Sequence, residues 1–500
     1  MNSPHLLPPG KSQRNLQVER LSNGKNGIIV IGGGLTGLSA GYVLTRAGLK
    51  VRVLERDSVV GGLSRTVFHN GFRFDLGGHR FFTKDDRINS LVRELMGGEL
   101  ISVPRKSKIY MQGKYFDYPL RPMNAMLGLG IPTTVKIFSD YVTEKARGIA
   151  GKPPPLSLED WVVGNFGRTM FNIYFKVYSE KVWGIDCSRI SAEWVEKRIS
   201  GLSLVKAVKN AFFKFSGRDM PTLADRFIYP RLGIGRISER LREEIEKKND
   251  VYTGAEVRCI NHSGFTVESV GVDVGGRFGA VEGKEFVSSI PLTKLIGLLR
   301  PAPPGDILEA ASRLSFRDLV VVAVMVDRKR VTDQTWIYIP EQKIPFGRIH
   351  EPTNWSESMA PAGKTLLVIE YFSFAGDRIW NESDGRLIDI TVENLEKLGF
   401  VKREEVLNGA VIRVPKAYPL FEVGYKEICE RLYEYLDGFT NLHLAGRSGM
   451  FRYYNMDHAI ASGVSGAEKI IAKQKCEVEE PGSAAGGGDE EALTVLNSAF

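Results

Sequence analysis

The segment from Ile28 to Gly62 restricts the possible folds of this chain more than any other. Four apolar residues, Ile28–Ile31, precede a glycine-rich turn, and a helical pattern then runs from Leu35 to Gly48. A second apolar run follows and ends at Glu55. This order predicts a buried strand, a tight turn, a helix and a second parallel strand, which is the beginning of an α/β fold.

Three glycines in the turn have the spacing of a dinucleotide-binding site. Gly32 permits the tight turn, Gly34 lets the backbone approach a pyrophosphate, and Gly37 lets the helix pack closely on the strand. The start of the helix supplies unpaired N–H groups and the positive end of a helix dipole, which favour a diphosphate. Glu55 stands where a carboxylate accepts hydrogen bonds from a ribose diol. Because the strand, helix and acid are all in order, we favour this site over a glycine-rich turn in an unrelated domain.

Two further glycine pairs follow the second strand. The first lies in Gly61–Thr66, which offers more backbone N–H groups together with polar side chains that can contact a diphosphate. The second lies in Phe72–His79. Nicotinamide dehydrogenases do not need this succession. It resembles the FAD-binding half of the superfamily that contains the amine oxidases, the protoporphyrinogen oxidases and the UDP-galactopyranose mutases.

The length and composition indicate a globular protein of several domains. Five hundred residues are too many for one hydrophobic core, so two or three domains are expected. The hydrophobic share of 43% and the charged share of 25% are ordinary for a soluble protein. The net charge of +8 suits an anionic small molecule or an anionic membrane surface. The basic residues are scattered and form no nucleic-acid motif, so no nucleic-acid partner is expected.

The cysteines and the apolar runs indicate a cytoplasmic location. Four widely separated cysteines form no metal-ligand pattern, so a reducing compartment and no bound metal are expected. The first 26 residues lack the apolar core of a signal peptide. The longest strongly apolar run, Leu319–Val326, is too short to span a bilayer and predicts a buried strand. No transmembrane segment is therefore expected, whereas peripheral membrane contact and a homo-oligomer stay open.

The resemblance to this superfamily, taken with the order of the remaining patterns, implies an α/β fold with a discontinuous, Rossmann-like FAD-binding domain and a substrate domain inserted into it. The substrate domain combines helices with an antiparallel sheet. The predicted divisions are a disordered lead-in (1–26), an FAD-binding domain (27–85, 225–300 and 415–473), a substrate domain (86–224 and 301–414) and a disordered tail (474–500).

Several local patterns predict single elements within these domains. Lys108–Tyr118 predicts a hairpin, and Ser157 predicts the start of a helix after three prolines. A final helix is expected over residues 455–473. Leu204–Phe215 predicts a helix with one apolar face and scattered lysines. We favour an ordinary packed helix there over a lid or a patch that contacts anionic lipid.

Further motifs resemble the UDP-galactopyranose mutases and their bacterial relatives from polysaccharide loci. Gly77-Gly78-His79 resembles the mutase motif whose histidine lies against the flavin. Tyr178 and Trp183 have the Tyr-x-x-Lys-x-Trp spacing of residues that line the nucleotide pocket. A helix that packs Tyr and Trp into its own core would show the same pattern. The resemblance favours the pocket and implies a substrate-binding role for both residues.

The same resemblance extends to a set of arginines, tyrosines and one asparagine. It implies that Arg198 and Arg348 hold a diphosphate, for which paired guanidinium hydrogen bonds are well suited. Gly347 replaces an aromatic residue that is common in the mutases. The segment between the tyrosine at 453 and the asparagine at 455 is shorter than in the eukaryotic mutases, so Tyr454 could take the substrate role instead of Tyr453. The catalytic residues implied are His79, Arg198, Tyr338, Arg348, Tyr418, Tyr453 and Asn455.

The glycine fingerprint and the resemblance together assign the cofactor site. Arg447 lies in a C-terminal motif similar to one that contacts FAD in the mutases, and Asp457 starts the last helix. The residues assigned to FAD are Gly32, Gly34, Leu35, Thr36, Gly37, Glu55, Arg56, Gly62, Leu63, Ser64, Gly77, Gly78, Val257, Gly446, Arg447 and Asp457.

The resemblance implies a flavin-dependent intramolecular transferase that acts on a nucleotide sugar. In such a mutase, N5 of reduced FAD bonds to the sugar, the nucleoside diphosphate leaves, and the sugar ring recloses at a different size. The flavin must first be reduced, and NAD(P)H is one candidate reductant. The alternatives are an FAD-dependent oxidoreductase of the amine oxidase or protoporphyrinogen oxidase type, and a non-catalytic flavoprotein scaffold.

Overall fold

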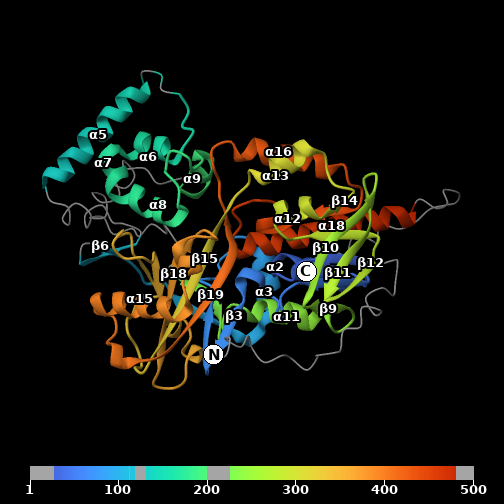
Figure 1. Ribbon diagram of the computed structural model, residues 1–500, viewed down its shortest axis with the longest axis horizontal. Coiled ribbons are helices and arrows are strands. Elements are labelled where there is room, and N and C mark those ends of the chain that lie inside the picture. The colour runs from blue at the N-terminus through green and yellow to red at the C-terminus, as the bar shows by residue number, and fades with distance from the viewer. Residues whose placement is uncertain are drawn as a thin grey trace.

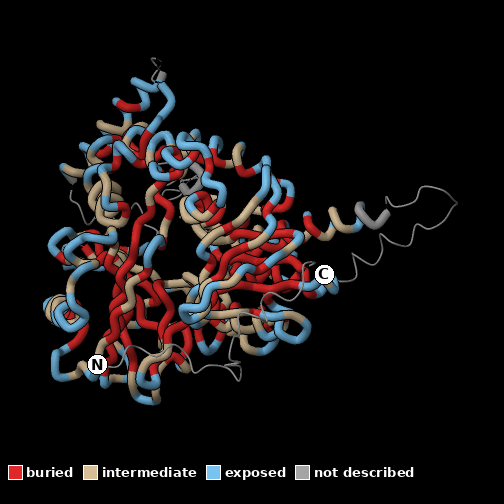
Figure 2. Tube along the Cα trace, turned by 45° about the vertical axis from the view of Figure 1, so that its right-hand side comes forward, coloured by how far each residue is buried: buried red, intermediate tan, exposed pale blue. Residues whose placement is uncertain are grey.

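The computed structural model describes residues 27–111, 113–118, 131–149, 151, 153–199 and 226–479. The lead-in and the basic helix Leu204–Phe215 therefore lie outside the described residues, and those two predictions stay untested. The described chain is a mixed α/β structure in which two large sheets stand side by side and a group of helices lies at one end (Figure 1). Figure 2 shows that buried segments follow both sheets, while exposed segments lie around them.

Five parallel strands form the sheet that begins with the N-terminal strand. Their order is β20-β13-β1-β2-β9, so β1 lies between its sequence neighbour β2 and the much later β13. Every residue of β1 and β2 is buried, as expected for strands covered on both faces. The bounds are β1 Ile28–Ile31, β2 Val51–Glu55, β9 Asp250–Thr253, β13 Glu285–Ser288 and β20 Leu442–Leu444.

Helices pack on this sheet and on each other at close range. Helix α2 (Leu35–Arg46) contacts the last helix, α18 (Met456–Glu479), and also α11 (Arg236–Ile245). A β-carbon at Gly37 would overlap the carbonyl oxygen of Gly32. A β-carbon at Gly463 of α18 would overlap the carbonyl oxygen of Thr36. Glycine is therefore needed at both positions for the strand and the two helices to meet. Helix α3 (Asp86–Met96) contacts α11 and α18.

A four-stranded sheet and three helices extend from this unit. Strands β12, β11 and β10 are antiparallel, and β14 pairs with β10 in parallel. These elements are β10 Ala255–Ser263, β11 Thr266–Val274, β12 Arg277–Glu282, β14 Leu299–Arg300, α12 Leu292–Leu298, α13 Gly305–Ser312 and α16 Tyr425–Asp437.

The second large sheet has seven strands in the order β19-β15-β18-β17-β16-β6-β7. All residues of β15 are buried, because α15 covers one face of the sheet and the β3–β4 hairpin covers the other. The strands are β6 Ser107–Met111, β7 Lys114–Asp117, β15 Phe316–Val326, β16 Trp336–Tyr338, β17 Arg348–His350, β18 Thr365–Ser373 and β19 Val406–Pro419. The smaller elements beside them are β3 Thr66–His69, β4 Phe72–Asp75, α14 Arg378–Asn381, α15 Asp384–Lys397 and α17 Gly446–Gly449.

A group of helices caps one end of the seven-stranded sheet, at the upper left of Figure 1. Ser157 caps α6, because its hydroxyl accepts from the N–H of Asp160 while the Asp160 carboxylate accepts from the N–H of Ser157. These helices are α5 Ile131–Ile149, α6 Leu158–Phe166, α7 Arg168–Met170, α8 Val177–Trp183 and α9 Ala192–Ile199. Strands β5 Leu100–Pro104 and β8 Arg226–Pro230 pair in a separate ribbon.

Most predicted elements occur with shifted ends. The hairpin predicted over Lys108–Tyr118 is β6 and β7, and it joins the edge of the seven-stranded sheet. The last helix continues to Glu479, so residues 474–479 are helical rather than part of a disordered tail. These residues are charged and polar, but they continue a helix whose earlier turns already pack on α2, and extending an existing helix costs little. No helix within the described ranges is long and apolar enough to cross a membrane.

Candidate functional site

A cavity of about 1210 Å³ lies between the two large sheets, and residues of α9 and α16 also line it. Its floor consists of the residues that follow the carboxyl ends of β1, β2, β13 and β20. Ligands of open α/β sheets bind at this edge. A single drug-sized ligand usually occupies a pocket of roughly 300–1,000 Å³. The cavity therefore has room for a dinucleotide and for a second ligand.

The glycine-rich turn and Glu55 form one wall of the cavity. The N–H of Gly33 donates to the Glu55 carboxylate at 2.7 Å, and the N–H of Asp57 donates to its other oxygen at 2.8 Å. Burial raises the pKa of Glu55. The N–H of Gly61 donates to the carbonyl oxygen of Gly33 at 2.8 Å, which ties the second glycine pair to the first.

This wall fits a dinucleotide. A β-carbon at Gly34 would meet no protein atom within 4 Å, so the space beside it is open to the cavity. Helix α2 begins there, and because its N-cap residue is Gly34, no side chain caps its first N–H groups. Leu35 and Thr36, the first residues of the helix, line the cavity. The first N–H groups of a helix bind phosphate well. Ser64 and the backbone of Gly62, which has a φ of +54°, lie beside them.

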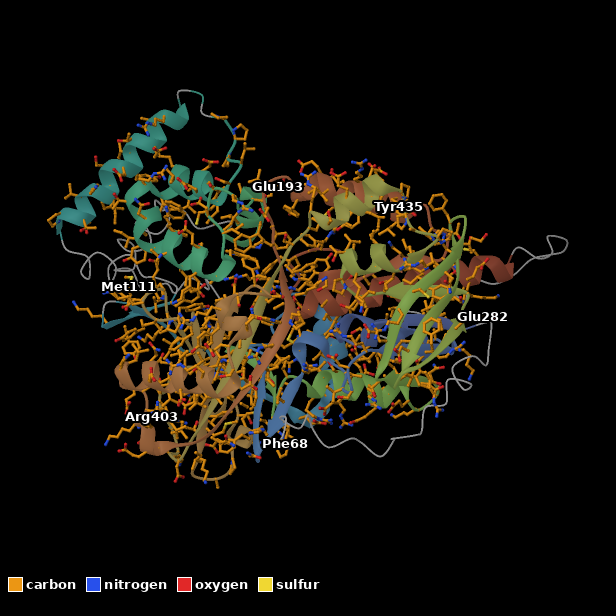
Figure 3. The ribbon with its side chains drawn as sticks, in the orientation of Figure 1. Phe68, Met111, Glu193, Glu282, Arg403 and Tyr435 are labelled. Carbon is orange, nitrogen blue, oxygen red and sulfur yellow. The ribbon has the colours of Figure 1, made fainter. Side chains whose placement is uncertain are left out.

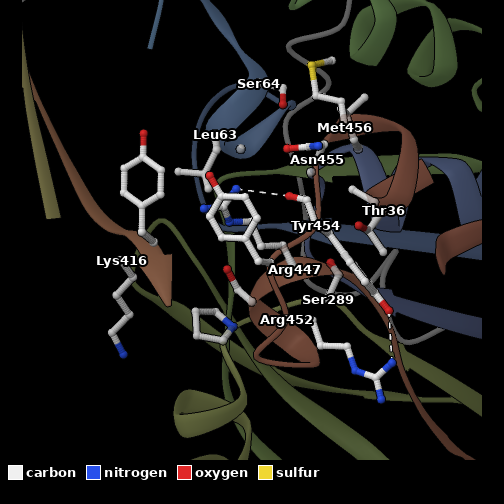
Figure 4. A pocket seen from close by; sticks show the side chains of 18 of the residues that line it. Thr36, Leu63, Ser64, Ser289, Lys416, Arg447, Arg452, Tyr454, Asn455 and Met456 are labelled. Carbon is white, nitrogen blue, oxygen red and sulfur yellow. Dashed lines mark hydrogen bonds between the residues drawn. The ribbon is translucent and has the colours of Figure 1, made fainter. Parts of the chain in front are cut away.

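Arg447 lies deep in the same cavity (Figure 4). Its guanidinium packs 4.9 Å from the ring centre of Tyr418 and 4.7 Å from that of Tyr453. One nitrogen donates to the carbonyl oxygen of Tyr454 at 3.1 Å. Nε and the remaining terminal nitrogen are buried and have no hydrogen-bond partner among the described residues. Such donors are costly to leave unpaired, which indicates that a bound group accepts from them.

His79 stands where the glycine-rich wall meets the opposite wall. Burial, together with the positive charges of Arg447 and Arg348, lowers the pKa of His79 to about 4, so its imidazole is neutral at pH 7. Within the described structure its Nδ1 has no hydrogen-bond partner. The preceding residue, Gly78, lies so close to Trp336 that a β-carbon would overlap the indole ring. Glycine at this position is thus needed to bring His79 to the cavity.

The opposite wall is built around Arg348. Its guanidinium donates to the Tyr418 hydroxyl at 3.1 Å, and its Nε lies 3.4 Å from a carboxylate oxygen of Glu370. The guanidinium also stacks on Phe372, 4.6 Å from the ring centre. A β-carbon at Gly347 would lie 2.7 Å from this ring. Phe372 therefore fills the space of the aromatic side chain that residue 347 lacks.

Tyrosines and tryptophans surround Arg348 in two layers. Tyr338 lines the cavity, and Tyr178 packs behind it with ring centres 5.7 Å apart. Trp183 likewise packs behind Tyr418, at 6.3 Å. Burial raises the pKa values of Tyr178 and Tyr418, so both hydroxyls keep their protons at neutral pH. They can therefore donate hydrogen bonds to an anion.

Two buried cations hold α8, the helix that carries Tyr178, against the sheet. The ammonium of Lys181 donates to the carbonyl oxygens of Ile339 and Glu341 at 2.9 and 2.7 Å. Arg317 donates to the carbonyl oxygen of Val182 at 3.0 Å. Burial lowers the pKa of Lys181 to about 7 and that of Arg317 to about 10.

The structure brings most of the predicted site residues to this one cavity. Those that line it are Gly32, Gly34, Leu35, Thr36, Glu55, Arg56, Gly62, Leu63, Ser64, Gly78, His79, Val257, Tyr338, Arg348, Tyr418, Arg447, Tyr453 and Asn455. Tyr178 and Trp183 lie behind the lining, as described above. Gly37, Gly77, Gly446 and Asp457 are not part of the lining either, and they belong to the turns and helix starts beside it. The side chain of Arg198, on α9, lies outside the described part of the structure.

Several residues of the cavity were not predicted. Arg105 lines it and packs 5.3 Å from the ring centre of Tyr118, and two of its nitrogens have no partner in the described ranges. Trp194 packs on Trp183 at 4.8 Å. Glu370, which lies beside Arg348 and is not part of the lining, was also missed, since an acid inside an apolar strand carries no motif. A charged residue in the otherwise apolar run Thr365–Ser373 was the available signal.

The charges of the lining favour anionic ligands. Among the described residues, ten Lys and Arg side chains line the cavity against five Asp and Glu side chains. A cleft lined mainly by one sign of charge attracts ligands of the opposite sign. The basic residues are Arg56, Arg65, Arg80, Arg105, Lys294, Arg348, Lys416, Lys426, Arg447 and Arg452.

Comparisons with known proteins agree with this geometry. A family model described as flavin containing amine oxidoreductase matches residues 35–471. Coproporphyrinogen III oxidase of Bacillus subtilis (strain 168) is 24% identical over 460 residues, which are 86% of this chain and 94% of that protein. Protoporphyrinogen oxidase 2 of Arabidopsis thaliana is 21% identical over 495 residues, 91% of this chain and 95% of that protein.

Solved structures show the same fold. A reduced UDP-galactopyranose mutase superposes with a TM-score of 0.77 at 22% identity, over 90% of this chain and 96% of the mutase. A putative protoporphyrinogen oxidase from Exiguobacterium sp. 255-15 superposes with a TM-score of 0.69 at 17% identity, over 90% of this chain and all of that one. At these identities the likeness shows a shared fold and leaves the substrate open.

Proposed function

Since this chain belongs to the flavin-containing amine oxidoreductase family, we propose that it is an FAD-dependent mutase acting on a nucleotide sugar. The reaction is a ring interconversion of the UDP-galactopyranose/UDP-galactofuranose type. The flavin follows from the family. The identity of the flavin as FAD rests on the dinucleotide wall described above, with its open space at Gly34 and its carboxylate at Glu55.

One observation carries the proposal: a buried arginine faces the dinucleotide wall and is ringed by tyrosine hydroxyls. Arg348 donates to Tyr418, and Tyr338 and Tyr453 line the cavity with it. An arginine that presents several donors in a fixed plane is suited to a diphosphate. Buried aromatic rings beside it give a planar base or a sugar a surface to pack on.

The residues of the chain bind, orient and stabilise the leaving group. When bound, the reduced flavin supplies the nucleophilic nitrogen of such a reaction. Arg348 stabilises the negative charge that builds up on the departing diphosphate, and we assign the same role to Arg198. Tyr338, Tyr418 and Tyr453 donate hydrogen bonds to its phosphates. Neutral His79 and Asn455 orient the groups between the two walls.

A second candidate is an oxidoreductase acting on a porphyrinogen. Two relatives that are named as porphyrinogen oxidases, from Bacillus subtilis and Arabidopsis thaliana, align with most of the chain. The excess of basic residues in the lining would also suit a substrate that carries several carboxylates. Here oxidised flavin would accept electrons from the substrate, and no reductant would be needed.

The two candidates differ in the flavin state that each requires. Enzyme reduced anaerobically with dithionite is expected to interconvert UDP-galactopyranose and UDP-galactofuranose, while oxidised enzyme does not. Chromatography of the nucleotide sugars measures the ratio. No interconversion, combined with bleaching of the oxidised flavin by coproporphyrinogen III, would replace the mutase by the oxidoreductase.

A matched pair of arginine variants locates the reaction. Arg348→Lys keeps a positive charge but loses the paired donors, so a loss of at least about 100-fold in kcat/KM is expected. Arg403→Ala removes an arginine that pairs with Asp389 on the outer surface, and it should leave the rate unchanged (Figure 3). Equal rates in both variants would place the reaction elsewhere.

A further inference from the structure

Glu370 is a fully buried carboxyl beside the arginine of the ligand-facing wall. It lies on β18 directly opposite Arg348 on β17, and the pairing of these strands puts both side chains on one face of the sheet. Nε of Arg348 and Oε2 of Glu370 are 3.4 Å apart. Neither atom has a hydrogen-bond partner within the described structure. The two groups thus attract each other without the directional bonds of a tight pair.

The remaining surroundings of Glu370 are neutral. Its Oε1 accepts from the N–H of Gly78 at 3.3 Å. Tyr178 from α8 and Tyr418 from β19 face it, and both are protonated phenols at neutral pH because burial raises their pKa values. His79, next to Gly78, is neutral as well. Arg348 is the cation whose charge favours an ionised Glu370, while burial alone raises the pKa of Glu370.

One arginine therefore serves two anions when a ligand enters. A phosphate that accepts from Arg348 takes over part of the positive charge that keeps Glu370 ionised. In the part of the chain that the structure describes, Glu370 has no cationic neighbour other than Arg348, so a ligand anion that shares this arginine with it leaves two negative charges that repel each other in a site of low dielectric. The carboxylate can lower this repulsion by taking a proton from water, after which it is a neutral acid that still accepts from Gly78. No bond in the ligand changes in this step.

We propose that binding of an oxyanion at Arg348 is coupled to the uptake of one proton by Glu370, so that this residue determines the pH range in which the site holds its ligand. The inference rests on the proposed function for the identity of the ligand as a nucleotide sugar. It goes beyond that function because it assigns a proton to the binding step and names the group that receives it. Glu370 is a positioning and charge-balancing residue for Arg348.

Calorimetry of the flavin-loaded protein, in its oxidised state and after anaerobic reduction, tests the coupling. UDP-galactopyranose and sulfate are the two probes, because neither changes its charge between pH 5.5 and 8.5. Titrations in buffers of different ionisation enthalpy give the protons taken up. We expect uptake that approaches one proton per ligand, and a Kd that rises by up to about tenfold per pH unit over the range of uptake.

Glu370→Gln is the central variant, because glutamine keeps an oxygen that can accept from Gly78 but cannot ionise. We expect no proton uptake, a Kd that does not change with pH, and tighter binding than wild type at pH 8.5. A residue with only a structural role would instead weaken binding at every pH. Glu351→Gln alters another buried carboxyl, which accepts from the N–H groups of Val331 and Thr332 rather than facing Arg348, and it should keep the wild-type pH dependence.

The outcomes separate this inference from the proposed function. Binding of either probe with the same proton uptake in wild type and Glu370→Gln would overturn the inference. Sulfate binding with Glu370-dependent uptake, but no binding of UDP-galactopyranose, would support the inference and overturn the nucleotide-sugar proposal. If neither probe binds, both are overturned, because Arg348 is then not an anion site.

Discussion

The two walls of the cavity are built by different means. The dinucleotide wall is mainly backbone, in which glycines at fixed spacing bring N–H groups to the surface. The ligand-facing wall is mainly side chain, in which Arg348 and Glu370 come from the paired strands β17 and β18, and Tyr418 comes from β19, which lies beyond β15 in the same sheet. A backbone wall depends on local spacing and is visible in the sequence. A side-chain wall depends on strand register, which joins residues far apart in the chain.

The difference has a physical basis in what each wall binds. A pyrophosphate needs several converging donors at close range, and backbone N–H groups supply them without any charged side chain. The opposite wall holds buried charges, which are stable only when they are paired. Arg348 and Glu370 supply this pairing, so removing the cation alone leaves a buried carboxylate without its partner.

The largest expected effect tests the backbone wall with two neighbouring glycines. Gly37→Ala should prevent folding of the flavoprotein, because its β-carbon would overlap the Gly32 carbonyl oxygen. Gly34→Ala should fold, because its φ of −76° suits alanine and no protein atom is within 4 Å, yet it should lose the flavin. Thermal unfolding and the visible absorbance of the purified proteins measure both. A yellow Gly34→Ala protein would contradict a close approach of cofactor to backbone.

The next effect concerns the paired charges of the side-chain wall. Arg348→Met should lower the free energy of unfolding by about 3–5 kcal/mol, because Glu370 is left buried without its cation. Adding Glu370→Gln should restore a large part of this loss. Urea unfolding at pH 7.5 of the wild type, both single variants and the double variant gives the coupling energy. Strictly additive losses would show that the two residues do not depend on each other.

An effect of similar size tests Asp75, a buried carboxyl beside the backbone wall. Asp75 accepts from Thr66, Tyr229 and the N–H of Ile234, and burial raises its pKa from 3.8 to about 7. The folded state therefore binds a proton that the unfolded state has lost between these pH values. Stability should fall as pH rises through this range, by up to about 1.4 kcal/mol per pH unit, and level off above pH 7.

Asp75→Asn is the variant that isolates this proton. It should flatten the dependence of the unfolding free energy on pH between 4 and 7, as measured by urea denaturation. An unchanged slope in the variant would assign the pH dependence to other groups.

The smallest effect is expected at the mouth of the cavity, where the two regions meet across α9 and α16. Glu193, which is labelled in Figure 3, lies 3.7 Å from Lys426, and both side chains are about half exposed. Exposed pairs contribute little, so Lys426→Ala should change the free energy of unfolding by less than about 0.5 kcal/mol. A loss of several kcal/mol in urea denaturation would mean that the mouth is held by charge rather than by packing.

The sequence predicted the backbone wall almost residue by residue. The strand, turn, helix and acid between Ile28 and Glu55 form as expected, because each is determined by neighbours in sequence. The hairpin near Gly113 and the cap at Ser157 are local in the same sense. Helix ends were less accurate: packing of α18 on α2 extends it to Glu479.

The side-chain wall was predicted only through resemblance, and only in part. Arg348 and Tyr418 were named, but Glu370 was not, since only the register of β17 with β18 brings it opposite Arg348. The sequence showed that Gly347 lacks an aromatic side chain. It could not show that Phe372, from the neighbouring strand, supplies the ring instead. The roles of these residues stay proposals until the variants above are measured.

The position of β1 in its sheet has a consequence for biosynthesis. β1 pairs with β13, and β13 pairs with β20, which ends at Leu444. The last helix then packs on α2 through Gly463. A nascent chain on the ribosome consequently exposes its nucleotide-binding turn before the partners that complete it exist. The turn can therefore hold a flavin in its native form only after the chain as far as α18 has been made, and a truncation upstream of Leu442 should yield a protein that does not retain it.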